Sequence, residues 1–263
     1  MVIACLLLLV GSRGPMNAQT LEWRQRLQPV NLPALYPNCP EHDQYITVIS
    51  DEFDKGYLDR WFWNADILGF NHTPNSIHTK EWCSLSSLSF PPNTGLMRIN
   101  ATADPIDTTG IAWMPPGELL LDSLPNRRVW PYQSGALTSK WAMEKGRYIL
   151  RTQITPGKDT WPAFWLFGDC ADEIDIIEFM QQDKDERHDR WISHSVHTEL
   201  VCGDGINPDT KGYNLKQDMT TALHTYGVEW DDFRIRFFTD GVVRRTFYHY
   251  YRRRSFCWKL HPT

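Results

Sequence analysis

Three carboxylates lie within six residues of one segment, Asp172-Glu-Ile-Asp-Ile-Ile-Glu-Phe179. The isoleucines between Glu173, Asp175 and Glu178 favour a β-strand, because β-branched side chains suit extended backbone. Side chains alternate along a strand, so Glu173 and Asp175 share one face, whereas unbroken alternation would send Glu178 into the core. Burying an unpaired carboxylate is costly. We therefore expect a β-bulge at Ile176-Ile177, one extra residue that returns Glu178 to the face of Glu173.

The spacing of the two glutamates indicates a type of chemistry. With the bulge, their Cα atoms are roughly 13 Å apart, and carboxyl groups that lean together can approach to about 5–5.5 Å. This separation is typical of a retaining glycosidase, in which one carboxylate attacks the anomeric carbon and the other exchanges protons with the leaving oxygen and with water. Asp175 would set the protonation of a neighbour through a shared hydrogen bond. The alternative, from these six residues alone, is a solvated acidic strand face without chemistry.

The sequence around this segment also predicts β-strands. Short apolar runs alternate with turn residues, and no long 3.6-residue periodicity persists. Asp240-Gly241 predicts a type I′ hairpin turn between 234–238 and 242–246, because both residues tolerate positive φ. Many strands in a chain of 263 residues indicate a β-sandwich or jelly roll. The predicted strands are 45–49, 95–100, 135–139, 147–154, 163–167, 173–178, 192–197, 225–230 and 234–238.

A family resemblance covers roughly residues 46 to 243. Trp161-Pro-Ala-Phe-Trp-Leu-Phe-Gly168, followed by Glu173 to Glu178, resembles the signature of glycoside hydrolase family 16 in its bulged Glu-x-Asp-x-x-Glu form. Further segments are similar to the family in the same order: 50–54, 134–140, 146–148, 226–230 and 239–241. The resemblance implies an all-β fold, a concanavalin-like β-jelly roll sandwich of two antiparallel sheets with a concave cleft for a β-linked polysaccharide. It also implies Glu173 as the nucleophile, Glu178 as the acid/base and Asp175 as their support.

Aromatic side chains and a histidine are candidates for contacts with the sugar. Alternation within 161–167 places Trp161 and Trp165 on one face, so both indoles face the cleft if Phe164 and Leu166 are core residues. An indole can stack on a pyranose ring, although packing under a loop is the alternative for each. The resemblance places His197 near the acid/base, whereas a lone strand histidine is more often an ordinary surface or core group.

The resemblance leaves the substrate open. A secreted, endo-acting, retaining hydrolase of β-1,3- or mixed-linkage glucan is the first expectation. A hydrolase of agar- or carrageenan-type galactans is the second, and a non-catalytic carbohydrate-binding jelly roll is the third, which the presence of all three acids argues against. A fourth alternative is an inactive fragment.

The amino-acid composition limits the kinds of molecule that the protein is expected to bind. The formal net charge is −5, so no excess of positive charge proposes nucleic acid, whereas 12 Trp, 10 Tyr and 12 Phe suit a polysaccharide partner. No stretch is long enough for a transmembrane helix, and no zinc-type ligand spacing occurs, so we expect no membrane partner and no metal in the site. We expect a monomer that needs no cofactor, and the resemblance permits a structural calcium away from the cleft.

The two ends of the chain carry further expectations. The apolar run 1–10 and the small residue Ala18 predict a signal peptide over residues 1–19, hence a secreted, extracellular or periplasmic protein. A Pro-rich leader follows over 20–44, and the jelly roll occupies 45–263. Its closing strand is not recognisable, so we expect a truncated or frameshifted C terminus that leaves a sheet edge open. The cysteines outside the signal peptide are Cys39, Cys83, Cys170, Cys202 and Cys257; Cys170–Cys202 is the preferred disulfide, although spacing cannot fix the pairing.

Overall fold

The computed structural model of the protein describes part of the chain. The described residues are 2–11, 45–64, 76–77, 88–110, 126–140, 145–156, 160–167, 173–179, 189–198, 207–231 and 233–248. All of the regular elements in these ranges are strands, which confirms the all-β fold class. None of the described residues forms a helix long and apolar enough to cross a membrane.

The strands vary from two to ten residues in length. They are β1 (Val2–Gly11), β2 (Tyr45–Asp51), β3 (Trp63–Asn64), β4 (Ser76–Ile77), β5 (Leu88–Ser89), β6 (Met97–Ile99), β7 (Ile106–Gly110), β8 (Asn126–Trp130), β9 (Tyr132–Gln133), β10 (Thr138–Ser139), β11 (Gly146–Gln153), β12 (Ala163–Phe167), β13 (Glu173–Glu178), β14 (Trp191–Thr198), β15 (Asn207–Asn214), β16 (His224–Trp230), β17 (Arg234–Thr239) and β18 (Val242–Tyr248).

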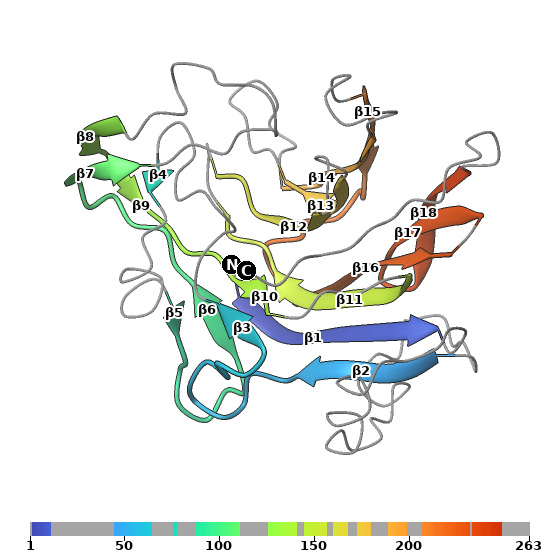
Figure 1. Ribbon diagram of the computed structural model, residues 1–263, viewed down its shortest axis with the longest axis horizontal. Coiled ribbons are helices and arrows are strands. Elements are labelled where there is room, and N and C mark those ends of the chain that lie inside the picture. The colour runs from blue at the N-terminus through green and yellow to red at the C-terminus, as the bar shows by residue number, and fades with distance from the viewer. Residues whose placement is uncertain are drawn as a thin grey trace.

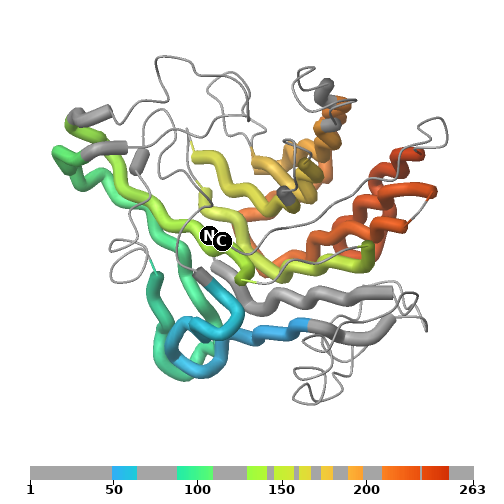
Figure 2. The backbone as a smooth tube through the Cα atoms, in the orientation of Figure 1, coloured from blue at the N-terminus to red at the C-terminus, as the bar shows by residue number. Residues whose placement is uncertain are grey.

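Two antiparallel sheets form the sandwich that the sequence predicts (Figure 1). The large sheet has eight strands in the order β18-β17-β16-β11-β1-β6-β5, and β2 also pairs with β1. The small sheet has four strands in the order β12-β13-β14-β15 and lies across the large one. Figure 2 traces the same path and shows β16 to β18, at the red end of the chain, beside β11. Two-stranded pairs β10-β3, β4-β9 and β7-β8 complete the described strands, and only β4-β9 is parallel.

The core lies between the two sheets. On β13, Ile174, Ile176 and Ile177 are buried, and the ring of Phe179 just beyond them meets Tyr226 of β16 edge to face, with 5.9 Å between the centroids. Burial of these apolar side chains fixes which face of β13 points inward. The opposite face of the strand is therefore free to present its polar side chains.

The hairpin between β17 and β18 confirms the turn that the sequence predicts. Asp240 has φ of 49° and Gly241 has φ of 76°, as a type I′ turn requires. Gly227 of β16 packs closely against residues of the two neighbouring strands, β11 and β17. A Cβ atom there would lie 2.3 Å from the ring of Phe238 and 2.6 Å from the carbonyl oxygen of Tyr148. Glycine is thus required where β11, β16 and β17 meet.

The N-terminal apolar segment has a definite place in the sheet. Residues 2–11, nearly all within the apolar run 1–10 of the predicted signal peptide, form β1 between β11 on one side and β2 and β6 on the other. The expected leader 20–44, the five cysteines named above and the chain beyond residue 248 lie outside the described residues.

Candidate active site

The strand that carries the three acids contains the predicted bulge. Asp175 lies opposite Ser195 of β14, yet the next pair in the ladder is Glu178 with Ser193, so Ile176 and Ile177 together face the single residue His194. On the other side, β12 also shifts in register, and Ile176 has no partner there. The extra residue is therefore Ile176, as the cost of burying Glu178 required.

The bulge brings all three acids to the face of the small sheet that points away from the core. Glu173 and Glu178 are half-buried, whereas Asp175 between them is buried. On β12, Ala163 lies opposite Glu178 and Trp165 lies opposite Asp175, so Trp165 shares their face. Leu166, opposite Ile174, is buried, and Phe164, opposite Ile177, packs against the core. The predicted division of side chains between the two faces of the sheet is confirmed for β12 (Trp165 against Phe164 and Leu166) and for β13.

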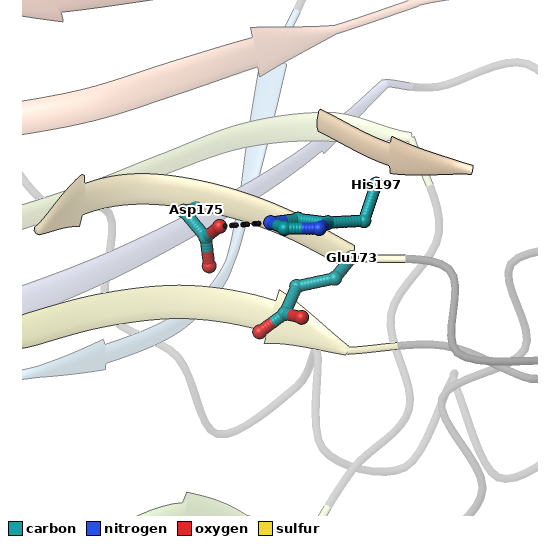
Figure 3. A group of neighbouring side chains, drawn as sticks. All are labelled: Glu173, Asp175 and His197. Atoms are coloured by element: carbon teal, nitrogen blue, oxygen red, sulfur yellow. Dashed lines mark hydrogen bonds and ion pairs between the residues drawn. The ribbon is translucent and has the colours of Figure 1, made fainter. Parts of the chain in front are cut away.

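Asp175 and His197 form a hydrogen-bonded pair beside Glu173 (Figure 3). The His197 Nε2 atom lies 2.8 Å from Asp175 Oδ2. His197 stands directly opposite Glu173 in the β13–β14 ladder, so its bond to Asp175 runs diagonally between the strands. This bond raises the pKa of His197, and the charges of Asp175 and Glu178 add to the effect against the burial of the ring.

Glu178 has a separate set of partners. Trp161 donates a hydrogen bond from its indole Nε1 to Glu178 Oε1 at 3.0 Å, and Ser195 donates to Oε2 at 3.4 Å. Thr210 of β15 in turn donates to the Ser195 hydroxyl at 3.0 Å. The Trp161 ring is 58% exposed, so it remains open to a ligand while it holds the carboxylate. The two glutamates are therefore held by different neighbours.

Burial and mutual repulsion raise the pKa values of the acids. Burial raises the pKa of Glu173 to about 9, with further contributions from Asp175, through its charge and a hydrogen bond, and from the charge of Glu178. Burial and the charge of Asp175 also raise the pKa of Glu178, against the hydrogen bonds from Trp161 and Ser195 and the charge of His197. The larger rise is at Glu173, so the carboxyl group of Glu173 keeps its proton at neutral pH in the free site.

Three further side chains on this face were not predicted to be functional. Ser195 and Thr210 form the chain of hydroxyls that ends on Glu178. Trp191 alternates with Ser193 on β14, so it shares the face of Glu178; it is 36% exposed and lies over Gly212 of β15, where a Cβ atom would sit 3.5 Å from the indole. The contacts of Ser195 and Thr210 depend on how the strands pair, which the sequence does not show. Trp191 could have been predicted, because side chains alternate along a strand and Trp191 is two residues from Ser193.

One set of side chains within the described ranges could hold a metal ion. Glu173, Asp175 and His197 each offer a donor atom, and these atoms lie within 4.8 Å of one another. Two carboxylates and an imidazole do not match the six to eight oxygen ligands of calcium. A transition metal would fit better, but it would displace the bond between His197 and Asp175. The group is better explained as part of the acid cluster.

Comparison with known proteins places this geometry in a family context. Residues 101–258, more than half of the chain, match the family model described as Glycosyl hydrolases family 16. A glucan endo-1,3-beta-glucosidase of Cryptopygus antarcticus is 26% identical over 220 residues, 78% of this chain and 70% of the relative. A keratan-sulfate endo-1,4-beta-galactosidase of Sphingobacterium multivorum is 25% identical over 130 residues, 44% of this chain and 28% of the relative.

A solved structure supports the fold. The laminarinase catalytic domain of Thermotoga maritima MSB8 is similar to this chain with a TM-score of 0.55 and 20% sequence identity, over 75% of this chain and 74% of that domain.

Proposed function

The chain belongs to the glycosyl hydrolases of family 16, and from this premise we propose that it is a retaining endo-glycosidase that cleaves a β-1,3- or mixed-linkage glucan. The observation that carries the proposal is the bulge at Ile176, because it sets Glu173 and Glu178 on one face of the small sheet. Two carboxyl groups on one face can act on opposite sides of a single glycosidic bond.

In the first step, the carboxylate of Glu173 attacks the anomeric carbon and forms a glycosyl ester. The glycosidic C–O bond breaks, and the leaving oxygen takes the proton of Glu178. The raised pKa of Glu178 supports this role, since a carboxyl group near its ordinary pKa of 4.5 would be ionised at neutral pH.

In the second step, Glu178 is a carboxylate and accepts a proton from water. The water oxygen attacks the anomeric carbon from the face that the leaving group has vacated, and the ester bond to Glu173 breaks. Two inversions retain the configuration, and both acids return to their starting states.

A nucleophile must be ionised, yet the pKa of Glu173 is raised to about 9 in the free site. The charge of Asp175 and its hydrogen bond with Glu173 are among the causes of this rise, so a change in either on substrate binding would lower the pKa of Glu173. Asp175 is held on its other side by His197, 2.8 Å away. We assign Asp175 and His197 to this adjustment of charge beside the nucleophile.

The substrate assignment draws on the relatives. The glucan endo-1,3-beta-glucosidase that covers 78% of this chain favours a β-1,3-glucan. Trp165 on the face of the acids, and the exposed Trp161 and Trp191, offer flat apolar surfaces on which a neutral pyranose ring can stack.

The test of function is hydrolysis by the purified protein. Wild type and Glu173→Gln are incubated with laminarin, lichenan, agarose and carrageenan, and reducing ends are counted. Release of new ends from laminarin or lichenan by wild type alone supports the proposal, and rapid loss of viscosity supports endo cleavage. Binding without cleavage would favour a carbohydrate-binding jelly roll instead.

The roles of the two glutamates have their own test. Glu173→Gly with added azide should yield a glycosyl azide of inverted configuration from an activated aryl glycoside, because azide replaces the missing nucleophile. Glu178→Gly should yield the azide of retained configuration through the intact ester. The opposite pattern would exchange the two roles.

A β-linked galactan is the second candidate substrate. The relation to a keratan-sulfate endo-1,4-beta-galactosidase favours it, although that match covers 44% of this chain. Agarose and carrageenan in the same assay distinguish the candidates. Cleavage of either galactan, with laminarin and lichenan intact, would move the assignment to this class.

Three further expectations accompany the function. We propose that the protein is secreted as a monomer, which N-terminal sequencing of the exported product and light scattering test. No cofactor enters the mechanism. A structural calcium away from the cleft is tested by the melting temperature with and without EGTA, and a fall on chelation would support it.

A further inference from the structure

A buried histidine lies directly beneath the bulge of β13. His194 is 0% exposed and faces both Ile176 and Ile177 across the ladder. Its Nδ1 atom lies 2.6 Å from the carbonyl oxygen of Ile176, the extra residue of the bulge. This histidine points to the opposite side of β14 from Ser193, Ser195 and His197, so it takes no part in the acid cluster.

The chemistry of the contact sets the direction of the bond. A carbonyl oxygen only accepts, so Nδ1 carries the proton and donates it. Burial lowers the pKa of His194 to about 4, and the charges of Arg245 and Arg244 contribute in the same direction. The ring is therefore neutral at neutral pH, and its Nε2 atom is buried without a partner among the described residues. The one donor of the ring is committed to the bulge.

The ring is fixed by aromatic neighbours from two other strands. It stacks on Phe237 of β17, with 4.7 Å between the centroids and 26° between the planes. Tyr213 of β15 contacts it at 5.4 Å and 51°. Because Phe237 belongs to the large sheet, rotation of the imidazole would disturb packing between the two sheets.

The backbone of the histidine is fixed as well. Arg245 of β18 is 8% exposed and donates from Nη1 to the carbonyl oxygens of His194, at 2.7 Å, and of Asp209, at 2.8 Å. Its Nη2 atom lies 2.7 Å from the Asp209 carboxylate. One guanidinium thus ties β14 and β15 to the large sheet at the level of the bulge.

We propose that His194 is a positioning residue, whose Nδ1–H bond to Ile176 holds the bulge in the form that presents Glu178 to the substrate. The proposal rests on the function given above and adds a residue to it. A bulge removes the carbonyl of its extra residue from the regular ladder, and a buried carbonyl without a donor is costly. The competing form of the strand is a regular ladder, which would turn Glu178 inward. His194 favours the bulge because it supplies the missing donor.

The variants separate the donor from the shape of the ring. His194→Phe keeps a flat ring against Phe237 and removes the donor. His194→Asn places an amide N–H where Nδ1 was, whereas His194→Gln places it one carbon further, where Nε2 was. The Asn and Gln variants put a similar polar group into the same site, so their comparison carries the test if His194→Phe does not fold. Phe237→Leu is the control that loosens packing and leaves the donor intact.

The measurement must respond to the position of the Glu178 carboxyl group and not to a general loss of folded structure. We compare kcat/KM for laminarin, whose leaving oxygen needs a proton, with kcat/KM for a 2,4-dinitrophenyl β-laminaribioside, whose leaving group departs without one. His194→Phe and His194→Gln should lower the value for laminarin by about tenfold or more and that for the aryl glycoside by less than about threefold. His194→Asn should restore most of the loss, and Phe237→Leu should change both substrates by the same factor. An equal loss on both substrates in His194→Gln, or equal behaviour of Asn and Gln, would overturn the proposal.

A second measurement needs no substrate. Amide hydrogen exchange over residues 176–179 should accelerate in His194→Gln and stay close to wild type in His194→Asn. Unchanged protection in both would show that the bond does not hold the bulge. If wild type cleaves none of the glucans, the proposed function fails while the exchange result still decides the role of His194.

Discussion

His197 and Asp175 are joined at 2.8 Å, and the histidine stands directly opposite Glu173, the residue next to Asp175 on the same face. The imidazole therefore faces the most perturbed carboxylate of the site while it bonds to its neighbour. The charge of His197 also lowers the pKa of Glu178. One side chain is thus hydrogen-bonded to Asp175, lies opposite Glu173 and lowers the pKa of Glu178.

We expect His197→Ala to shift the pH dependence of activity. Without the charge that His197 contributes, the pKa of Glu178 rises further, so the alkaline limb of kcat/KM against pH should move to higher pH, and kcat should fall by about tenfold or more. His224→Ala is the matched control, because His224 and Asp240 also form a 2.8 Å pair, at the start of β16 in the large sheet. The control should lower the melting temperature and leave the shape of the pH profile unchanged; a shift in both variants would refute the coupling.

Glu173→Gln should stabilise the protein at neutral pH. The pKa of Glu173 is raised from 4.5 to about 9, so between these values the folded state keeps a proton that the unfolded chain releases. The free energy of unfolding therefore falls as pH rises through this window. Glutamine mimics the protonated acid at every pH, so the variant should gain on the order of 1–3 kcal/mol at about pH 7 and almost nothing at about pH 4.

Urea unfolding at the two pH values measures this gain. Glu52→Gln makes the same chemical change outside the acid cluster and is the control for the substitution itself. A gain for Glu173→Gln that is as large at about pH 4 as at about pH 7 would mean that proton binding is not its cause.

The strand that carries the acids could be predicted because its residues leave few alternatives. Three isoleucines belong on the core side of the strand and three carboxylates on the opposite face, and only an extra residue near Ile176 satisfies both. The Asp240-Gly241 turn was predicted for a similar reason, since few residue pairs accept positive φ at both positions. Local chemistry was sufficient in both places.

Other parts of the site depend on contacts between distant strands. Asn207–Asn214 has no apolar alternation and contains Pro208 and Gly212, yet it forms β15 because β14 offers it a ladder at the edge of the small sheet. The bond from Thr210 to Ser195 follows from that pairing. The acceptor of His194 likewise depends on the register across the bulge. Predicted strand 135–139 is reduced to Thr138–Ser139, which pairs with β3 alone.

The N-terminal segment allows a test of its contribution to the sheet. β1 pairs with β11 from Val2 to Val10 and with β2 and β6 on its other side. A chain that starts at residue 20 lacks these backbone hydrogen bonds, so its melting temperature should lie below that of the chain from Met1. Equal melting temperatures, measured by circular dichroism, would show that β1 adds nothing to stability and would agree with removal of residues 1–19 on export.

Gly227→Ala should destabilise the fold without altering the chemistry. The new methyl group would meet the Phe238 ring at 2.3 Å and the Tyr148 carbonyl at 2.6 Å, and a backbone atom cannot yield as a flexible side chain can. A loss of about 2 kcal/mol or more is expected, which corresponds to a fall of roughly 4–8 °C in melting temperature. Gly212→Ala, whose methyl group would meet Trp191 at an ordinary 3.5 Å, is the tolerated control. A Gly227→Ala protein as stable as the control would contradict the packing.

Trp161→Phe should separate the two roles of this indole. The ring can still stack on a sugar after the change, but the Nε1 hydrogen bond to Glu178 Oε1, 3.0 Å long, is lost. Because that bond lowers the pKa of Glu178, its removal should move the alkaline limb of kcat/KM to higher pH, with a smaller effect on KM. Trp165→Phe reduces the aromatic surface opposite Asp175 on the face of the acids. This variant should raise KM and leave the alkaline limb of kcat/KM at the same pH. If Trp161→Phe instead raises KM with an unchanged pH profile, the indole acts as a stacking surface and its bond to the acid is incidental to catalysis.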